Sequence, residues 1–157
     1  MTAPLVHETL QKFRLIVGAV RQHSRALEAA CGINGAQVWM LAAIAEAPDS
    51  TVSQLSQALS IHISTASNLL DKLARAGLVE RLRTEEDRRV VLLRLTDAGK
   101  AVVERAPKPL TGLVFDALEK MPEDALTRLD TELTTLIAHM NLVDESAANE
   151  PMSNLVR

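Results

Sequence analysis

The most concentrated cationic chemistry in the sequence lies in residues 81–95, RLRTEEDRRVVLLRL, where five arginines surround the acidic cluster Glu85-Glu86-Asp87. An arginine side chain is planar, permanently charged and rich in donors, so it suits contact with phosphate groups and narrow negative grooves. A carboxylate among arginines can accept hydrogen bonds and hold one guanidinium in place. The segment therefore predicts a local contact with a polyanion. The competing interpretation is a charged hairpin exposed to solvent.

A second polar cluster stands at the start of a leucine-rich segment, and its spacing places the polar side chains opposite the leucines of a helix over about 63–76. Short polar side chains there can contact base edges and phosphates in a major groove, and the alternative is a solvated, capped helix face. Asn68 is the best candidate for reading a base, because an amide can form two hydrogen bonds with adenine. The candidates are His62, Ser64, Thr65, Ser67, Asn68 and, one turn later, Lys72 as a phosphate contact.

Composition describes an ordinary one-domain protein of 157 residues, of which 47% are hydrophobic and 24% charged. With one Trp, two Phe and no Tyr, the core must be aliphatic. A single Cys cannot form an internal disulfide, which is typical of a reducing compartment. The first residues, MTAPLVHETL, lack the blocks of a signal peptide, and no window approaches the ~18 apolar residues of a membrane span. We therefore expect a cytoplasmic protein.

The net charge of −3 gives no general indication of nucleic-acid binding, but the charges are unevenly distributed. Residues 51–100 hold eight Lys or Arg against six Asp or Glu, whereas the rest of the chain holds nine against fourteen. A mildly basic middle between acidic flanks favours a chain whose centre meets a polyanion and whose ends have another role.

The elements that must position these residues are predominantly helical. Apolar residues recur at helical spacing over about 5–30, 35–47, 51–59 and 63–76, with Asn34 and either Thr51 or Ser53 as N-caps. Ser60-Ile61-His62 forms a tight connection between the third and fourth helices, and Gly77 ends the fourth.

The period then changes from helical to extended. Residues 78–83 and 89–95 are strand-forming segments, and the polar residues 84–88 join them as a hairpin. Thr96 caps the next helix, which Pro107 and Pro109 must break or kink. A last helix starts near Pro122 with apolar residues at steps of three and four, and the polar residues 143–157 are expected to be frayed.

Three motifs stand in one order and spacing across this central block: GLVER at 77–81, Asp87-Arg88-Arg89, and LTDAG at 95–99. Together with the two short helices before them, they resemble the winged helix-turn-helix core of the MarR family of transcription regulators. The resemblance implies that Arg89 enters a minor groove and that Asp87 positions the tip of the wing. Arg88 flanks the same tip, whereas Arg81 and Arg83 on the first strand are either phosphate contacts or surface charges.

The resemblance also implies a mainly α fold with a small β-hairpin wing (α+β), and a homodimer on a palindromic operator in double-stranded DNA. We expect one MarR-like domain over 1–157, with a DNA-binding core at 34–100 and a polar tail at 143–157. The apolar seams at 5–31 and 101–142 are too long for that core to cover, so they are predicted to pair across a two-fold axis. The expected function is sequence-specific regulation of transcription, as a repressor relieved by a signal.

A small aromatic or amphipathic effector is implied at the junction between the dimerisation helices and the DNA-binding core. A ligand wedged there would change the distance between recognition helices, to which a two-fold operator is sensitive. The candidate lining residues are Phe13, His23, Trp39 and Met40.

Two alternatives remain. Cys31 could make the chain a redox-sensing regulator, but the chain lacks the tyrosines that such family members use, and a helix C-terminus disfavours a thiolate. The chain could also be a winged-helix protein-interaction module that does not contact DNA. The sequence has no catalytic motif of the common hydrolase, phosphate-loop or metalloprotease types, and its scattered histidines form no metal pattern, so we expect no enzyme, cofactor or metal site.

Overall fold

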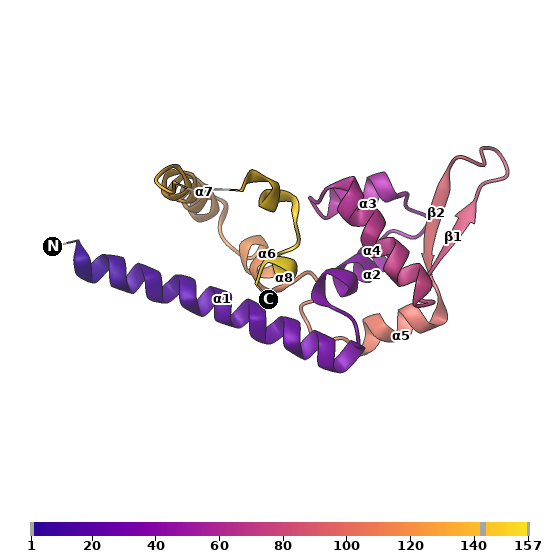
Figure 1. The fold of residues 1–157 in the computed structure, drawn as a ribbon, viewed down its shortest axis with the longest axis horizontal. Coiled ribbons are helices and arrows are strands. Elements are labelled where there is room, and N and C mark those ends of the chain that lie inside the picture. Colours follow the sequence, from indigo (N-terminus) through magenta and orange to yellow (C-terminus); the bar gives the residue numbers. More distant parts are fainter. Residues whose placement is uncertain (1, 142–143, 157) are drawn as a thin grey trace.

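The computed structural model describes residues 2–141 and 144–156. Helices account for most of these residues, and the hairpin of β1 and β2 projects at the end of the molecule away from the N-terminus (Figure 1). The elements in chain order are α1 (Ala3–Cys31), α2 (Gly35–Glu46), α3 (Val52–Ala58), α4 (Ile63–Arg75), β1 (Val79–Arg83), β2 (Val91–Leu95), α5 (Asp97–Arg105), α6 (Leu113–Glu119), α7 (Glu123–Ala138), the 3-10 turn η1 (Glu145–Asn149) and α8 (Met152–Leu155).

Local sequence explains where the helices of the core begin. Asn34 and Thr51 each form a capping box with the Gln three residues later, which satisfies two backbone donors at the start of α2 and of α3. The Thr96 hydroxyl accepts a hydrogen bond from the nitrogen of Gly99 and so caps α5. Each cap of this kind stabilises its helix by about 1 kcal/mol. The predicted caps at these three positions are confirmed.

The core is aliphatic, as expected, and it lies where α2, α4 and α5 pack beneath the hairpin. α4 contributes Ala66, Leu69, Leu70 and Leu73 on one buried face and leaves a polar face outward. Burial of each such leucine contributes roughly 1.5–3 kcal/mol. A polar recognition face is therefore held in a fixed orientation by the leucines behind it.

The hairpin is antiparallel, with Val79 opposite Leu95 and Arg83 opposite Val91. Leu93, which has no exposed surface, anchors β2 in the core. Its backbone also exchanges hydrogen bonds with the α2–α3 connection, because its nitrogen donates to Ser50 O and its oxygen accepts from Asp49 N. The base of the wing is thus fixed to the helix-turn-helix.

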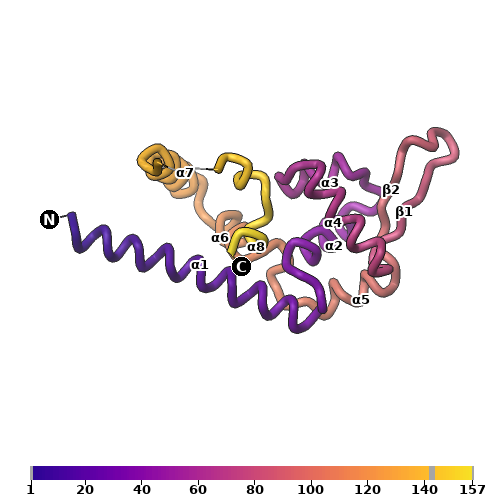
Figure 2. Tube along the Cα trace, viewed as in Figure 1, coloured from indigo at the N-terminus to yellow at the C-terminus, as the bar shows by residue number. Residues whose placement is uncertain are grey.

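α1 and α7 extend away from this core (Figure 2). Residues 2–19 of α1 and 131–140 at the end of α7 are all exposed, although they carry many large apolar side chains. Those exposed at more than a third of their surface include Leu5, Val6, Leu10, Phe13, Leu15, Ile16, Val17, Leu133, Leu136, Ile137 and Met140.

Three expectations about the C-terminal half need correction. The segment after Pro107 contains a separate short helix, α6, which the sequence analysis did not predict. Pro122 is the N-cap residue of α7 rather than its first helical residue. The tail expected to be frayed is folded over its described residues 144–156, where η1 and α8 pack against α1 and α2. Residues 142, 143 and 157 of the predicted boundaries lie outside the described residues.

Candidate nucleic-acid interface

The outer face of α4 presents a line of exposed polar side chains. Ser64, Asn68 and Lys72 are exposed and recur every four residues, so they lie on one face of the helix, opposite the buried leucines. Ser67 lies beside this line and is partly buried. The outer face of the helix therefore carries two hydroxyls, one amide and one cation.

At the start of α4, one candidate side chain already has a hydrogen-bond partner within the protein, which the sequence did not suggest. His62 is the N-cap residue and is exposed, but its side chain makes no capping hydrogen bond. Thr65 is partly buried, and its hydroxyl donates to Oε1 of Glu150 at 2.8 Å. One candidate DNA contact is thus already engaged by a residue of the C-terminal segment.

Asp87 organises the tip of the wing. Its Oδ1 accepts a hydrogen bond from the backbone nitrogen of Arg89 at 2.9 Å and a longer one, 3.4 Å, from Nε of the same residue. Thr84 closes the turn, since its hydroxyl donates to Asp87 O at 2.7 Å and accepts from Asp87 N at 3.1 Å. The Arg89 side chain remains 93% exposed, so the tip holds the arginine at its base and leaves its guanidinium accessible.

The other wing arginines divide into two groups. Arg83 and Arg88 are exposed and line a shallow hollow beside Thr84 and Glu85. Arg81 instead forms an ion pair with Asp71 of α4. It therefore ties the first strand to the recognition helix, a role that the sequence analysis did not foresee.

Arg94 forms a second link between wing and helices. Its guanidinium donates to both carboxylate oxygens of Asp49, and the Nη2–Oδ2 distance is 2.8 Å. These hydrogen bonds hold the pKa of Asp49 below its ordinary value, and the attraction of the arginine charge lowers that pKa further. Asp49 has a φ of 65° and lies within the α2–α3 connection, so the ion pair fixes the wing against that turn.

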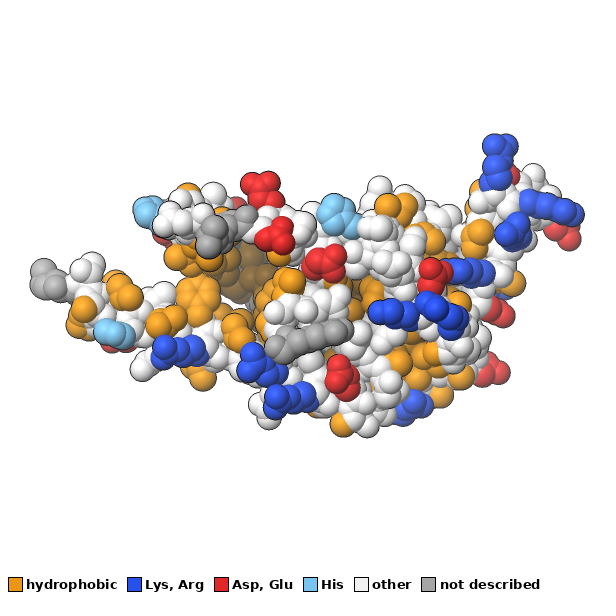
Figure 3. Space-filling view, in the orientation of Figure 1, with side chains coloured by type: hydrophobic (Ala, Val, Ile, Leu, Met, Phe, Trp, Pro, Cys, Tyr) orange, Lys and Arg blue, Asp and Glu red, His pale blue; other side chains and the backbone are white. Residues whose placement is uncertain are grey.

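Charged and apolar side chains are unevenly distributed over the surface. In Figure 3, Lys and Arg side chains gather over the wing and the adjacent helices and also occur along α1, whereas apolar side chains are concentrated where α1 and α7 face each other. The wing and the helices beside it are therefore the candidate surface for contact with a polyanion.

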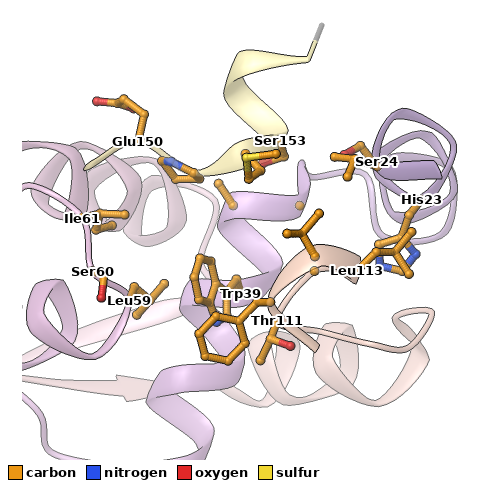
Figure 4. A pocket seen from close by; sticks show the side chains of 18 of the residues that line it. His23, Ser24, Trp39, Leu59, Ser60, Ile61, Thr111, Leu113, Glu150 and Ser153 are labelled. Atoms are coloured by element: carbon orange, nitrogen blue, oxygen red, sulfur yellow. The ribbon is translucent and has the colours of Figure 1, made fainter. Parts of the chain in front are cut away.

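A cavity of about 360 Å³ lies between these two ends. Its walls come from α1, α2, the α3–α4 connection, α6 and the C-terminal segment (Figure 4). Trp39 packs against Phe115 with ring centroids 5.4 Å apart, and His23 Nε2 lies 3.0 Å from Pro109 O. The lining also includes Val20, Ser24, Leu27, Leu59, Leu113 and Met152.

Two of the four predicted ligand-lining residues do line this cavity, and two do not. His23 and Trp39 are in its wall. Met40 is fully buried in the core, because the residue after Trp39 points about 100° away around the helix. Phe13 lies outside the cavity on the exposed part of α1. Phe115 was missed because it follows a proline-rich connection whose path has no periodic signal in the sequence.

Cys31, the last residue of α1, is 7% exposed and packs in the core cluster.

Within residues 2–141 and 144–156, no three His, Cys, Asp or Glu side chains are grouped to hold a metal ion. In the same residues, no single helix is long and apolar enough to span a membrane, although the pair α1 and α2, bent by 70°, meets that criterion by length and composition alone.

Comparison with known proteins decides the family. A family model described as the MarR family matches residues 32–90. Over 107 residues, the chain is 33% identical to the multiple antibiotic resistance protein MarR of Escherichia coli, a match that covers 66% of this chain and 74% of that protein. The chain belongs to the MarR family. It is also 35% identical over 88 residues to the transcriptional regulator PecS of Dickeya dadantii, of which it covers 53%, and that match spans 56% of this chain.

Solved structures with the same architecture carry DNA or ligands. Streptococcus pneumoniae FabT in complex with DNA aligns with a TM-score of 0.55 and 28% identity, over 87% of this chain and 95% of FabT. A MepR-like protein complexed with pseudoligands aligns with a TM-score of 0.58 and 26% identity, over 83% of this chain and 94% of that one. The chain is thus a MarR-family DNA-binding transcription regulator, and the winged helix-turn-helix predicted from its sequence is confirmed.

Proposed function

We propose that this MarR-family regulator acts as a homodimer on a palindromic operator, with α4 in the major groove and the wing in the adjacent minor groove. The observation that carries the proposal is the pairing of two exposed features on one end of the molecule. Ser64, Asn68 and Lys72 form a polar line on α4, and Arg89 stands free at a wing tip ordered by Asp87. Helix and wing are tied together through Asp71 and Arg81, so they would meet DNA as one unit.

The two surfaces would read DNA by different means. The amide of Asn68 can form two hydrogen bonds with a base edge, whereas Lys72 would contact a phosphate without regard to sequence. Arg89 carries a narrow, permanent charge suited to the negative potential of a narrow minor groove. Arg83 and Arg88 add charge beside it, and His62, Ser64 and Ser67 would contribute phosphate or base-edge contacts around Asn68.

The exposed apolar residues of α1 and α7 support the dimer. Leu133, Leu136 and Ile137 lie at helical spacing on one side of α7, and leaving such a row in water is unfavourable by roughly 25 cal/mol per Å² of apolar area. In this proposal the segments 5–31 and 101–142 pair with a second copy, and residues 34–100 form the DNA-binding core. Two-fold symmetry would then place two α4 helices in successive major grooves, about 34 Å apart.

The cavity supports relief of repression by a small effector. Its volume of about 360 Å³ lies within the usual range for small-molecule sites, and aromatic and aliphatic side chains make up most of its lining. In Figure 4 the carboxylate of Glu150 points away from Trp39, so an uncharged aromatic or amphipathic molecule fits the lining best. A molecule between α1 and the α3–α4 connection would change the spacing of the two recognition helices.

Selection of bound sites from random duplex DNA tests the proposal. We expect enrichment of one palindrome whose half-sites are centred about 10 base pairs apart, as a two-fold dimer requires. A variant with both Asn68→Ala and Arg89→Ala serves as the control and should enrich sites more weakly, with base preference lost at one position in each half-site. Failure of the wild-type protein to enrich any sequence would contradict the proposal and favour a protein-interaction module instead.

A further inference from the structure

The C-terminal segment, residues 144–156, folds back over the molecule and bridges three helices; we call it the strap. The strap lies against the core, where α8 packs on α1 and α2 (Figure 2). Nε of Arg21 donates to Val156 O at 3.4 Å. The strap also approaches the start of α2, because a Cβ added at Gly35 would lie 3.4 Å from the Cβ of Ser153, within van der Waals contact.

The strap also holds the first turn of the recognition helix. The backbone nitrogen of His62 donates to Asn149 O at 3.3 Å, and the hydroxyl of Thr65 donates to Oε1 of Glu150 at 2.8 Å. Pro151, which is buried, follows directly and fixes the backbone as the strap passes from η1 to α8. The adjacent strap residues Asn149 and Glu150 thus contact the N-cap residue of α4, His62, and its third residue, Thr65.

The charge of this contact opposes DNA. The N-terminus of a helix carries partial positive charge and unpaired N–H groups, and DNA phosphates use such ends as binding positions. Glu150 places a carboxylate in the first turn of α4, where a phosphate would otherwise be favoured. Every ionisable side chain of the strap is acidic, namely Asp144, Glu145 and Glu150.

We propose that the strap is an autoinhibitory element, in which Glu150 competes with DNA for the first turn of α4. The inference rests on the proposed DNA-binding function. When DNA binds, the strap must release Thr65 and His62, and the work of that release lowers the affinity for DNA. Glu150 is therefore a regulatory residue rather than a DNA contact.

The strap also connects the cavity to α4. Glu150 itself lines the cavity, together with its strap neighbours Ala148, Pro151, Met152 and Ser153. A molecule that fills the cavity while the strap is closed adds contacts to the closed state alone. By linkage, it stabilises the state in which Glu150 blocks α4 and so releases DNA. This gives derepression a route within one protomer, in addition to any change in helix spacing.

DNA affinity of charge variants tests the proposal on the full-length chain. Glu150→Gln keeps an acceptor for Thr65 and removes the charge, and Glu150→Ala removes both. We expect about fivefold tighter binding of the selected operator for Glu150→Gln and about tenfold for Glu150→Ala, within the range set by the net contribution of one hydrogen bond. The gain should shrink as salt rises, because salt screens the carboxylate. Glu145→Gln removes an equal charge from an exposed strap position and should leave the affinity unchanged.

Hydrogen exchange on the wild-type chain supplies a second, independent measurement. Addition of the operator should speed exchange in residues 149–155 while slowing it in α4. Two results would overturn the autoinhibitory role and leave the proposed function standing. In one, the Glu150 variants bind the operator with wild-type affinity or more weakly. In the other, the strap stays protected from exchange on DNA. Absence of operator binding in the wild type and in every variant would overturn both.

Discussion

Arg94 of β2 and Asp49 of the α2–α3 connection form a two-point ion pair that joins the wing to the helix-turn-helix. The backbones beside them are also joined, since Leu93 exchanges hydrogen bonds with Asp49 and Ser50. The wing is therefore fixed at its base and free only at its tip. A fixed base lets the tip arginine meet DNA at a set distance from α4.

Arg94→Gln should raise the pKa of Asp49 back toward its ordinary value of 3.8, because the hydrogen bond from Arg94 is the largest cause of its lowering. Folding lowers this pKa, so the ion pair stabilises the fold above pH 3.8, and that contribution is lost as the pH falls through the lowered value. An NMR titration of the Asp49 carboxyl in the wild type and in the variant measures the two pKa values. An identical midpoint in wild type and variant would contradict the anchoring role.

Asn68→Ala should cost roughly 1–3 kcal/mol on the selected operator and relax base preference at one position in each half-site, because a bidentate base contact is lost. Lys72→Ala is the matched comparison on the same face of α4. It should weaken binding about equally on all sequences, since a phosphate contact carries no sequence information. Binding measured on a panel of single-base operator variants separates the two. An unchanged preference profile for Asn68→Ala would place base reading elsewhere.

Replacement of Leu129 and Leu133 by Glu should abolish the dimer and operator binding together, because it puts two charges per protomer into the proposed seam. Both positions are already at least partly exposed within one protomer, so the helical content should stay as in the wild type. Thr131→Glu, which points to the opposite side of α7, should leave the dimer intact. Sedimentation measures the mass of the wild type and of each variant, and so distinguishes monomer from dimer. A wild type that sediments as a monomer and still binds the palindrome would refute the dimer.

Cys31→Ser should leave operator affinity and its response to mild peroxide unchanged. Cys31 is buried in the core at the C-terminal end of α1, where neither access nor helix dipole favours a reactive thiolate. Mobility shifts with and without peroxide test this prediction. Release of DNA by the oxidised wild type, but not by the variant, would establish the redox-sensing alternative.

Local signals in the sequence predicted the DNA-binding half of the fold well. Asn34, Thr51 and Thr96 predict helix starts, because each can cap the backbone nitrogen three residues later. The change from helical to extended periodicity after Gly77 predicts the hairpin. The family resemblance then indicated a role for Arg89 and Asp87. These features depend on contacts within a few residues, which is why one sequence was enough.

The cavity and the strap depend on contacts between distant segments, which the sequence does not display. Phe115 meets Trp39 only because α6 packs against α1 beside α2, and Glu150 meets Thr65 across 85 positions. The polar composition of residues 143–157 predicted a frayed tail. In the structure, Pro151 is buried and α8 packs against α1 and α2. Met40 was assigned to the ligand site because it neighbours Trp39, although adjacent helical residues face different surroundings.

A salt titration of operator affinity for wild type and Arg89→Ala tests the central claim, that wing and recognition helix bind DNA together, most directly. Each protomer loses one cation, so the slope of log K against log salt should fall in magnitude by about two for the dimer. The loss of affinity should be the same on the operator and on a scrambled duplex. Asp87→Ala should give a milder loss with little change in slope, since the positioning of the arginine is lost but its charge is kept. Wild-type slope and affinity in Arg89→Ala would show that the wing does not touch DNA and would contradict the account.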